Sequence, residues 1–504
     1  MSKFNTVKTN SNLTTNKAGG VAYKQSTKLE LVSLLVTSLL AGDKAYETES
    51  EIVERLVNLY NSLNSEDKTF FAKASIYARD KFRLRSISHL CSAILAEGVV
   101  MNNYTEDDKK WLKGYFSKVI MRADDITETI SAYASRPNAY KSKAGRIQLP
   151  SVVKKGLSLA MANYDEYIMA KYKQEGKTFS LVDAVNMVHT KATEKNATAL
   201  KNLVEGTLKS ADTWQVKQTQ AGKAENKEEA KKEAWADFLA KGERIEYFAL
   251  LRNLRNILQT GNKELVSQAA QLLCNEKLVK NSKVLPFRFM TAYDILDEFD
   301  SRTLKQALNK AIEISLSNVP ELSGKTAILV DVSGSMGSRL SYQGSTRVID
   351  VAALFAAVLY KTNDSDIIPF GEQAYSCKPN PDDSIFTIAG KMRANDGGTN
   401  MSAGFQALKK KYDRIIILSD MQTWMDHGYW GVGAQTQQAY KEYRKNYNPD
   451  CKLYTMDLAG NGTMQFPEAN VACIAGFSEH VFTVMGKLEE DKNAMVHEIE
   501  AIEL

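Results

Sequence analysis

The chain has 504 residues, of which 44% are hydrophobic and 25% are charged. At roughly 100–200 residues per domain, this length predicts two to four folded units and excludes a single hydrophobic core. The composition argues against a wholly disordered chain. The longest apolar run, residues 31–41, is well short of the ~20 residues that a membrane-spanning helix needs.

The cysteines and the first residues indicate the compartment. Residues 1–17 contain no apolar block, so no secretory signal is expected. The five cysteines are scattered and never form a C-x-x-C pair, which argues against structural zinc and against a disulfide framework. We therefore expect a cytoplasmic protein that does not associate with membranes.

Charge divides the chain into two parts. The first 320 residues hold 48 Lys and Arg against 37 Asp and Glu, whereas the remainder holds 17 against 23. A basic front and an acidic back predict two modules with different partners. Drift of surface charge between domains, without functional meaning, is the alternative.

The predicted elements of the first 320 residues are almost all helical. Residues 1–25 are polar and predict a flexible or extended arm. From there to residue 320, segments such as LELVSLLVTSLL and ESEIVERLVNLYNSL carry apolar residues at three- and four-residue spacing. Consecutive amphipathic helices with short connections predict an α-solenoid of degenerate helical repeats over residues 26–320.

Residues 321–504 predict an α/β domain instead. KTAILVD, DSDIIPF, RIIILSD and CKLYTMD read as strands, with helical segments between them. Alternation of this kind predicts a mainly parallel, Rossmann-like sheet covered on both faces. Ligands of such sheets bind beyond the carboxyl ends of the strands, near the point where the strand order reverses.

A set of oxygen donors is expected at that edge. Asp331, Ser333 and Ser335 follow a buried strand at alternate positions, Thr399 opens a helix, and Asp420 closes another strand. Carboxylates and hydroxyls suit Mg²⁺ or Mn²⁺ better than zinc, and five donors would leave one position for an outside carboxylate or phosphate. A serine-rich turn is the alternative for the first motif alone. His427 has no nucleophile beside it in sequence, so we expect a surface histidine and a binding site rather than a hydrolase.

Basic residues mixed with aromatic ones predict an RNA interface in the front half. Cations contact phosphates, and aromatic rings stack on unpaired bases. The alternative is solvated helix ends and inter-helix salt bridges, and Arg252 and Arg255 in particular fit a role in bracing helix packing. The candidates are Arg79, Lys81, Arg83, Arg85, Lys171, Lys173, His189, Arg252, Arg255 and Arg288.

Two resemblances extend this interpretation. The oxygen-donor trio resembles the metal-ion-dependent adhesion site of von Willebrand factor A domains, which implies Asp331, Ser333, Ser335, Thr399 and Asp420 as direct or water-mediated ligands of a divalent ion, Mg²⁺ being expected. Together with YFALLRNLRNIL, LCNEKLVKNSKVLPFRF and AKYKQ in the front half, it looks like the Ro (SS-A/Ro) ribonucleoprotein family, of a bacterial or phage type.

That resemblance implies a ring of HEAT-like helical repeats, the TROVE module, joined to a von Willebrand A domain. It also implies that the ring takes single-stranded ends of misfolded noncoding RNA, and that an outer surface with Lys171, Lys173 and His189 holds a small Y-like RNA.

The expected function is therefore non-enzymatic RNA binding in RNA quality control, by a monomer whose metal site recruits a carboxylate-bearing protein partner such as an exoribonuclease. A metal-dependent protein-interaction scaffold without RNA is the alternative. A metal-dependent hydrolase lacks a base and a second acidic cluster, and an extracellular adhesin conflicts with the missing signal and the unpaired cysteines.

Overall fold

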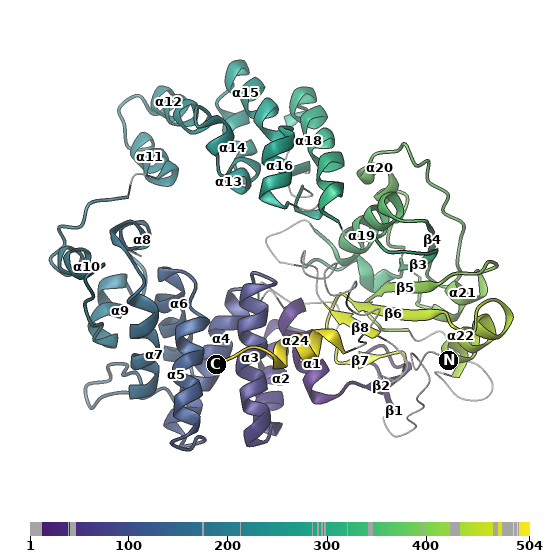
Figure 1. Cartoon of the computed structure of the whole chain (residues 1–504), viewed down its shortest axis with the longest axis horizontal. Helices are drawn as coiled ribbons and strands as arrows, with labels where there is room; N and C mark the ends of the chain where they lie inside the picture. Colours follow the sequence, from purple (N-terminus) through teal and green to yellow (C-terminus); the bar gives the residue numbers. More distant parts are fainter. Residues whose placement is uncertain are drawn as a thin grey trace. The chain divides into compact units, whose positions relative to one another are not determined.

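A computed structural model describes most of the chain, and its elements are drawn in Figure 1. The described residues are 13–38, 40, 47–173, 176–211, 213–284, 286–289, 292–293, 296, 299–319, 321–340, 346–395, 397–423, 434–466, 472–475, 487, 491 and 493–504. His427 lies outside them. In the described part, no helix has both the length and the hydropathy of a transmembrane span.

The chain forms two compact units, each built from three separate stretches of the sequence. The helical unit contains Thr27–Leu40, Glu49–Thr213 and Met495–Leu504, and the mixed unit contains Met1–Ser26, Ala41–Thr48 and Trp214–Ala494. The sequence suggested boundaries at residues 25 and 320. The compact units divide the helical repeats near residue 213, and the helices from Trp214 onward belong to the same unit as the α/β part.

The helical unit consists of amphipathic helices packed in succession, as the three- and four-residue spacing of apolar residues predicts. α3 packs on α4, α4 on α6, α5 on α7, and α6 and α7 on α9. The helices are α1 (Thr27–Thr37), α2 (Glu49–Ser62), α3 (Ser65–Asp80), α4 (Ser86–Val100), α5 (Asp108–Lys118), α6 (Ala123–Ala134), α7 (Ser151–Met161), α8 (Glu166–Lys171), α9 (Leu181–Val188) and α10 (Ala197–Val204).

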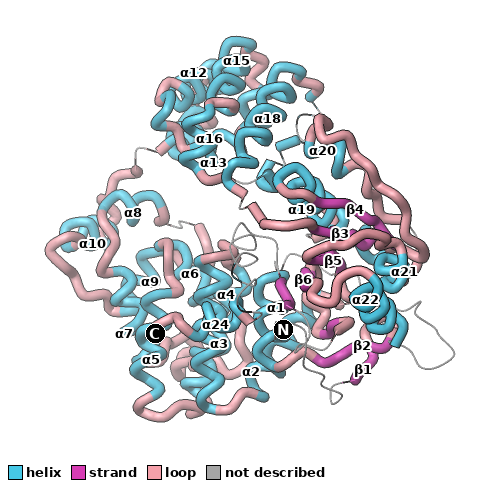
Figure 2. The backbone as a smooth tube through the Cα atoms, turned by 45° about the vertical axis from the view of Figure 1, so that its right-hand side comes forward, coloured by secondary structure: helices cyan, strands magenta, loops and turns pink. Residues whose placement is uncertain are grey.

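The helical repeats continue in the mixed unit. α15 packs on α18 and α12. The end of this region packs on α19 (Val348–Thr362) of the α/β part, and the Tyr293 ring centroid lies 4.1 Å from that of Phe386, on α20 (Ile385–Ala389). The helices are α11 (Trp214–Ala221), α12 (Lys227–Leu239), α13 (Tyr247–Arg252), α14 (Leu254–Gln259), α15 (Lys263–Leu273), α16 (Glu276–Ser282) and α18 (Arg302–Ser315). The predicted α-solenoid is confirmed in both units (Figure 2).

The α/β part is built on a parallel sheet with the strand order β4-β3-β5-β6-β8, in which every neighbouring pair is parallel. The strands are β3 (Thr326–Asp331), β4 (Ser365–Phe370), β5 (Arg414–Ser419), β6 (Lys452–Asp457) and β8 (Ala472–Ala475), and the helices are α19 (Val348–Thr362), α20 (Ile385–Ala389), α21 (Met401–Gln406) and α22 (Ala434–Asn446). The last helix, α24 (Ala494–Glu500), belongs to the helical unit from Met495 onward.

Both faces of this sheet are covered. Leu329 and Ile417 share a core with Phe405 of α21 and Tyr440 of α22. The alternate residue Ile328 points to the opposite face and is equally buried, and α19 packs against β3 and β4. Because β4 lies on one side of β3 and β5 on the other, the strand order reverses at β3.

The N-terminal segment is not a flexible arm over its described residues. β1 (Leu13–Thr15) and β2 (Val21–Lys24) form an antiparallel hairpin, and β2 pairs with β7 (Thr463–Met464). The polar composition that suggested an arm is explained by side chains such as Asn16, which is buried and bonded to the α/β part.

Candidate metal centre and nucleic-acid interface

The two predicted carboxylates come together at the point where the strand order reverses. Asp331 is the last residue of β3, and Asp420 directly follows Ser419, the last residue of the adjacent strand β5. Parallel strands end at the same edge, so both carboxylates lie there. Each is less than 3% exposed.

Serine hydroxyls connect the two carboxylates. The Ser333 hydroxyl donates to Asp331 Oδ1 at 2.6 Å and lies 3.4 Å from the Ser335 hydroxyl, which in turn hydrogen-bonds to Asp420. The Ser419 hydroxyl donates to Asp331 Oδ2 at 2.6 Å. The Asp331 carboxylate and the Ser333 and Ser335 hydroxyls of the first motif therefore lie next to one another, in a turn closed by the Ser333 amide, which donates to Asp331 Oδ1 at 2.9 Å.

Thr399 is brought to the same edge by its loop. The Gly334 amide donates to the Gly397 carbonyl at 3.0 Å, which holds the loop containing Thr399 against the first motif. The Thr423 hydroxyl donates to the Thr399 carbonyl at 2.7 Å, and Thr399 itself is 1% exposed.

The electrostatics of this edge favour a bound cation. Burial raises the pKa of Asp331, and burial together with the negative charge of Asp331 raises the pKa of Asp420 to about 7. Among the described residues, no Lys or Arg forms an ion pair with either carboxylate, and their partners are hydroxyls and backbone amides. Two neighbouring buried carboxylates are costly without a positive charge, which a divalent ion would supply.

The donor set also selects the kind of ion. Among the described residues, no three His, Cys, Asp or Glu side chains are grouped to hold a metal. The centre instead combines two carboxylates with hydroxyls, which are hard oxygen donors and fit Mg²⁺ or Mn²⁺. The residues present therefore fit the predicted ion.

Sequence reasoning missed part of this centre. Ser419 holds Asp331, and the buried Asp457 at the end of β6 adds to the negative potential at Asp420. Ser419 and Asp457 are the last residues of two predicted strands, and this position at a strand end is the sequence signal that could have identified them. A small cavity of about 20 Å³ adjoins Asp420 and offers an approach to it. It is lined by Ser338, Arg339, Leu340, Val348, Asp420, Leu458, Ala459 and Asn461.

The predicted RNA-binding residues at the end of α8 form a cation–aromatic cluster. The Lys171 ammonium lies 5.6 Å from the ring centroids of both Tyr167 and Tyr172, and the Arg122 guanidinium lies 4.7 Å from that of Tyr172. Tyr167 is 46% exposed. Sequence reasoning missed Tyr167, which lies one turn before Lys171 on α8, and Arg122, which comes from a distant segment. We call Arg122, Tyr167, Lys171 and Tyr172 the stacking cluster.

Lys173 and His189 belong to the same unit as this cluster. The Lys173 ammonium donates to the Leu208 carbonyl, which ties it to the segment after α10. His189 is exposed and caps α9 in the left-handed region, with φ 56°. A positive φ is uncommon for a residue other than glycine, but histidine is among the side chains that adopt it more often than most.

Arg79 and Arg85 have a structural role rather than the predicted phosphate contact. Arg79 is buried, and its Nη2 donates to Asp125 Oδ2 at 2.8 Å. Arg85 donates to Asp124 and Asp125 at 2.8 and 3.0 Å, and His89 lies 3.0 Å from Asp125. Both arginines thus form the inter-helix salt bridges of the alternative interpretation; Arg79 is buried in them, whereas the Arg85 side chain is 33% exposed.

Lys81 and Arg83 differ from these two arginines. Both side chains are exposed, and they pair with Asp80 on the surface at 2.8 and 3.5 Å. Exposed pairs are weak and open readily to a competing phosphate, so both remain candidates.

The remaining candidates lie in the mixed unit. Arg252, Arg255 and Arg288 are exposed. The Arg252 Nε donates to the Phe248 carbonyl one turn earlier, and the Arg255 guanidinium lies 5.8 Å from the Phe299 ring centroid. The Arg252 bond lies within α13 and braces no second helix, whereas the Arg255 contact joins two segments of the helical repeats. All three side chains are exposed and remain candidates.

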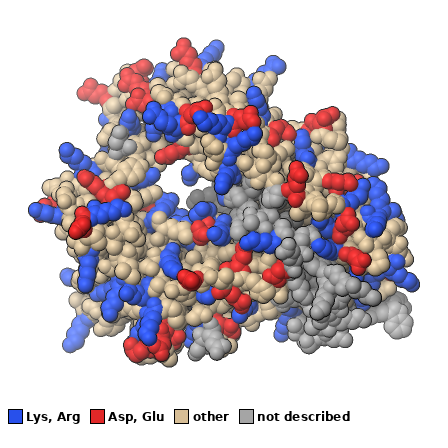
Figure 3. Space-filling model, viewed as in Figure 1, with Lys and Arg blue, Asp and Glu red and all other residues tan. Residues whose placement is uncertain are grey.

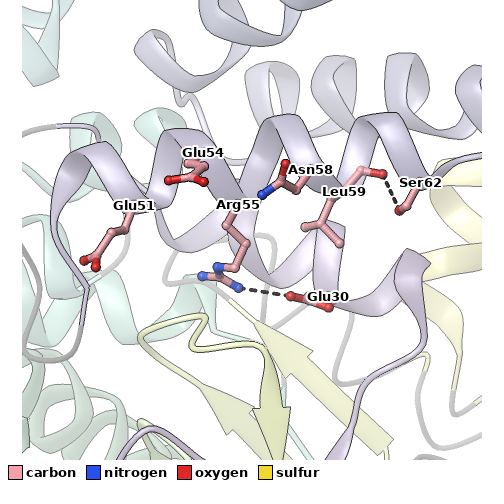
Figure 4. A pocket seen from close by; sticks show the side chains of 7 residues that line it. All are labelled: Glu30, Glu51, Glu54, Arg55, Asn58, Leu59 and Ser62. Carbon is pink, nitrogen blue, oxygen red and sulfur yellow. Dashed lines mark hydrogen bonds and ion pairs between the residues drawn. The ribbon is translucent and has the colours of Figure 1, made fainter.

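Surface charge does not by itself mark one interface. In Figure 3 basic and acidic side chains are interspersed over the visible face. A cavity of about 360 Å³ on the helical unit is lined by Glu30, Glu51, Glu54, Arg55, Asn58, Leu59 and Ser62, and Arg55 pairs with Glu30 at 3.4 Å (Figure 4). Its three glutamates would repel phosphate, so we exclude it from the RNA interface.

Comparisons with known families decide the identity. Residues 6–234 and 208–333 match the TROVE domain, and residues 325–488 match the Ro60 vWA domain. The chain belongs to the Ro family. Proteins of the Ro family are RNA-binding scaffolds and not enzymes, and their partners include noncoding RNA. The predicted family and the predicted von Willebrand A domain are thereby confirmed.

Individual relatives are distant. The crystal structure of the Deinococcus radiodurans RO (RSR) protein has a TM-score of 0.59 and 18% identity, over 92% of this chain and 100% of that one, which confirms a Ro-like fold. Telomerase protein component 1 of Mus musculus is 23% identical over 365 residues, and that of Rattus norvegicus over 366. Each match covers 56% of this Ro-family chain and only 13% of the curated relative.

Proposed function

We propose that this Ro-family chain is the protein of a small ribonucleoprotein that holds a Y-like noncoding RNA at the stacking cluster. The observation that carries the proposal is the Lys171 ammonium, which lies 5.6 Å from the ring centroids of both Tyr167 and Tyr172. The ammonium can contact a phosphate while an exposed ring stacks on an unpaired base. Lys173 and His189 extend this surface, as the resemblance implied.

We further propose that the helical repeats form a ring that takes single-stranded ends of misfolded RNA, in RNA quality control. The exposed Arg252, Arg255 and Arg288, with Lys81 and Arg83, are the candidate phosphate contacts. A cytoplasmic location suits this role. It is supported by Cys91, Cys274, Cys377 and Cys451, which are free thiols.

Charge reversal tests the first proposal. Lys171→Glu with Lys173→Glu and His189→Asn should weaken binding of a Y-like RNA and flatten its salt dependence by roughly 0.7 per lost phosphate contact. Asparagine is chosen at 189 because it tolerates the left-handed backbone. The control is Lys109→Glu with Lys110→Glu on α5, which reverses two lysine charges as Lys171→Glu with Lys173→Glu does, and so changes the net charge by the same amount. Equal affinity and slope for both variants would remove the stacking cluster from the proposal.

We propose that Asp331, Ser333, Ser335, Thr399 and Asp420 hold a divalent ion, with Mg²⁺ expected, directly or through water. When bound, the ion would offset the two carboxylates and offer a coordination position to an outside carboxylate. Such a position suits a carboxylate-bearing protein partner, and an exoribonuclease is the partner that the quality-control role calls for.

Asp331→Ala should abolish the stabilisation of the full chain by MgCl₂ while leaving RNA affinity unchanged within about twofold. Mass action predicts about 2.7 kcal/mol of stabilisation for the wild type at 100-fold the dissociation constant. Asp382→Ala, an exposed aspartate of the same unit, is the control and should keep the full effect. A wild-type melting temperature unmoved by Mg²⁺ and Mn²⁺ would overturn the metal proposal and leave the RNA proposal standing.

A further inference from the structure

The N-terminal hairpin bonds directly to the loop that follows Asp420. The Asn16 Nδ2 donates to the Thr423 carbonyl at 2.7 Å, and the Lys17 amide donates to Gln422 Oε1 at 2.8 Å. Asn16, Gln422 and Thr423 are all buried. More than 400 residues of sequence separate the two partners of each bond.

The Asn16 side chain is itself fixed by the hairpin turn. Its Oδ1 accepts from the amides of Ala18 and Gly20 at 3.1 and 2.8 Å, and Gly19 adopts the φ of +88° that the turn requires. The Asn16 side-chain oxygen is therefore bonded within the hairpin turn, and its side-chain nitrogen is bonded to Thr423. Because both ends of this side chain are fixed, it restricts the position of the Thr423 backbone.

The loop needs support of this kind. Met421 has φ +61° and is buried, a backbone conformation that a non-glycine residue keeps only when its surroundings determine it. The support comes from two sides. Gln465 Nε2 donates to the Met421 carbonyl at 2.8 Å, and Asn461 Nδ2 donates to the Asp420 carbonyl at 3.2 Å from the segments flanking β7. The hairpin holds the far end of the loop, at Gln422 and Thr423.

From Thr423 the connection continues to the metal centre. The Thr423 hydroxyl donates to the Thr399 carbonyl at 2.7 Å, and the Gln422 amide donates to Asp420 Oδ1 at 3.1 Å. Two of the five candidate ligands, Thr399 and Asp420, are thus each one hydrogen bond away from a residue that the hairpin binds. Groups that orient ligands commonly change metal affinity by 10–100-fold when they are lost.

We propose that Asn16 is a positioning residue of the metal centre, so that the docked hairpin raises divalent-ion affinity. The proposal rests on the metal centre proposed above. By linkage, a bound ion should stabilise the docked hairpin by the same factor by which the hairpin raises affinity.

Asn16→Asp is the decisive variant, because it keeps the Oδ1 acceptor for the turn and removes the Nδ2 donor to Thr423. Titration calorimetry of the EDTA-stripped full chain with MnCl₂ and MgCl₂ should show about tenfold weaker binding than in the wild type. Tyr23→Phe is the matched control on the same hairpin. It removes only the hydroxyl that accepts from Gln437 at 2.6 Å and should change affinity by less than about twofold.

Hydrogen exchange provides a readout that needs no metal. In EDTA, the Asn16→Asp variant should exchange the Met421 and Gln422 amides faster than the wild type, while the Gly20 amide keeps its protection. Thr423→Val removes the second step of the connection, tests the same prediction independently, and serves if Asn16→Asp does not fold.

The outcomes separate the two proposals. If the wild type binds the ions and both Asn16→Asp and Thr423→Val bind them with the wild-type affinity, the positioning role is overturned and the metal centre is kept. A wild type that binds neither ion overturns both. Unchanged exchange at Met421 and Gln422 in both variants overturns the positioning role whatever the calorimetry gives.

Discussion

The buried charge cluster at Asp125 gives the sharpest test of how the helical unit is held together. Asp125 on α6 is fully buried and accepts from Arg79 and His89 at 2.8 and 3.0 Å, and the Met121 and Arg122 amides donate to it as well. Asp125→Asn removes the charge with almost no change of shape. It leaves the guanidinium of Arg79 buried without its counter-charge, while the Arg79 Nε already lacks a hydrogen-bond partner.

The expected cost is large because one member of a buried pair is lost. Breaking a buried ion pair costs about 3–5 kcal/mol. At about 2–4 °C per kcal/mol for a unit of this size, the melting transition of the helical unit should fall by roughly 6–20 °C. Circular dichroism of the full chain measures the shift, and hydrogen exchange in α3 and α6 assigns it to this unit.

The effect should also depend on pH with a definite sign. Burial alone would raise the pKa of Asp125, but hydrogen bonds from His89 and Arg79 outweigh it and hold the pKa well below its usual value. A carboxyl with a lowered folded-state pKa stabilises the fold above its unfolded pKa of about 3.9, and this contribution is lost as pH falls below that value. The difference between wild type and Asp125→Asn should therefore be full at pH 7 and shrink below about pH 4.

The control is Asp107→Asn, whose exposed pair with Lys110 should contribute less than about 0.5 kcal/mol. An Asp125→Asn variant within about 1 kcal/mol of the wild type at pH 7 would refute the reasoning, and with it the structural role assigned to Arg79.

Three further predictions follow from packing and surface chemistry. Gly156→Ala should cost about 1–3 kcal/mol by denaturant unfolding, because a new Cβ would lie 2.5 Å from the Phe116 Cβ; Gly222→Ala, with only ordinary contacts, should be near neutral, and equal costs would contradict this account. Trp235→Ala should lower the free energy of unfolding by about 3–5 kcal/mol, and it should change the fluorescence of Trp214, whose ring centroid lies 5.9 Å away. A loss below about 1 kcal/mol would count against a packed α11–α12 pair. Tyr167→Ala should weaken binding of a Y-like RNA by about 1–3 kcal/mol in fluorescence anisotropy, because an unpaired base loses its stacking partner, whereas Tyr140→Ala, at a similarly exposed ring, should not; identical losses would show that the ring at 167 is not a stacking site.

Much of the geometry of the candidate metal centre was predictable because its residues occupy fixed places relative to strands. A buried β-branched run ending in D-x-S-x-S must place alternate side chains on one side, and a second parallel strand ending in Asp420 must end at the same edge. Ser419 could have been predicted in the same way, from its position at the end of β5. The roles of Asn16 and Thr423 could not, because their bond joins segments at opposite ends of the chain.

The basic residues show the opposite case. Arg79, Lys81, Arg83 and Arg85 look alike in sequence, four cations within seven residues. Arg79 and Arg85 form ion pairs with aspartates on α6, whereas Lys81 and Arg83 are exposed. Which arginine meets a carboxylate depends on how α3, α4 and α6 pack, and helix periodicity specifies only the face on which each residue lies.

The sequence by itself determined the helical repeats, the parallel sheet and the oxygen donors at its carboxyl edge, because each follows from local periodicity and from the geometry of a single strand or helix. Only the tertiary structure decided which charges are paired, where Arg122 meets Tyr172, and that the N-terminal segment is a hairpin docked beside Asp420. Hydrogen bonds and ion pairs between distant segments depend on distances of a few ångströms, and those distances exist only once the helices and strands have packed.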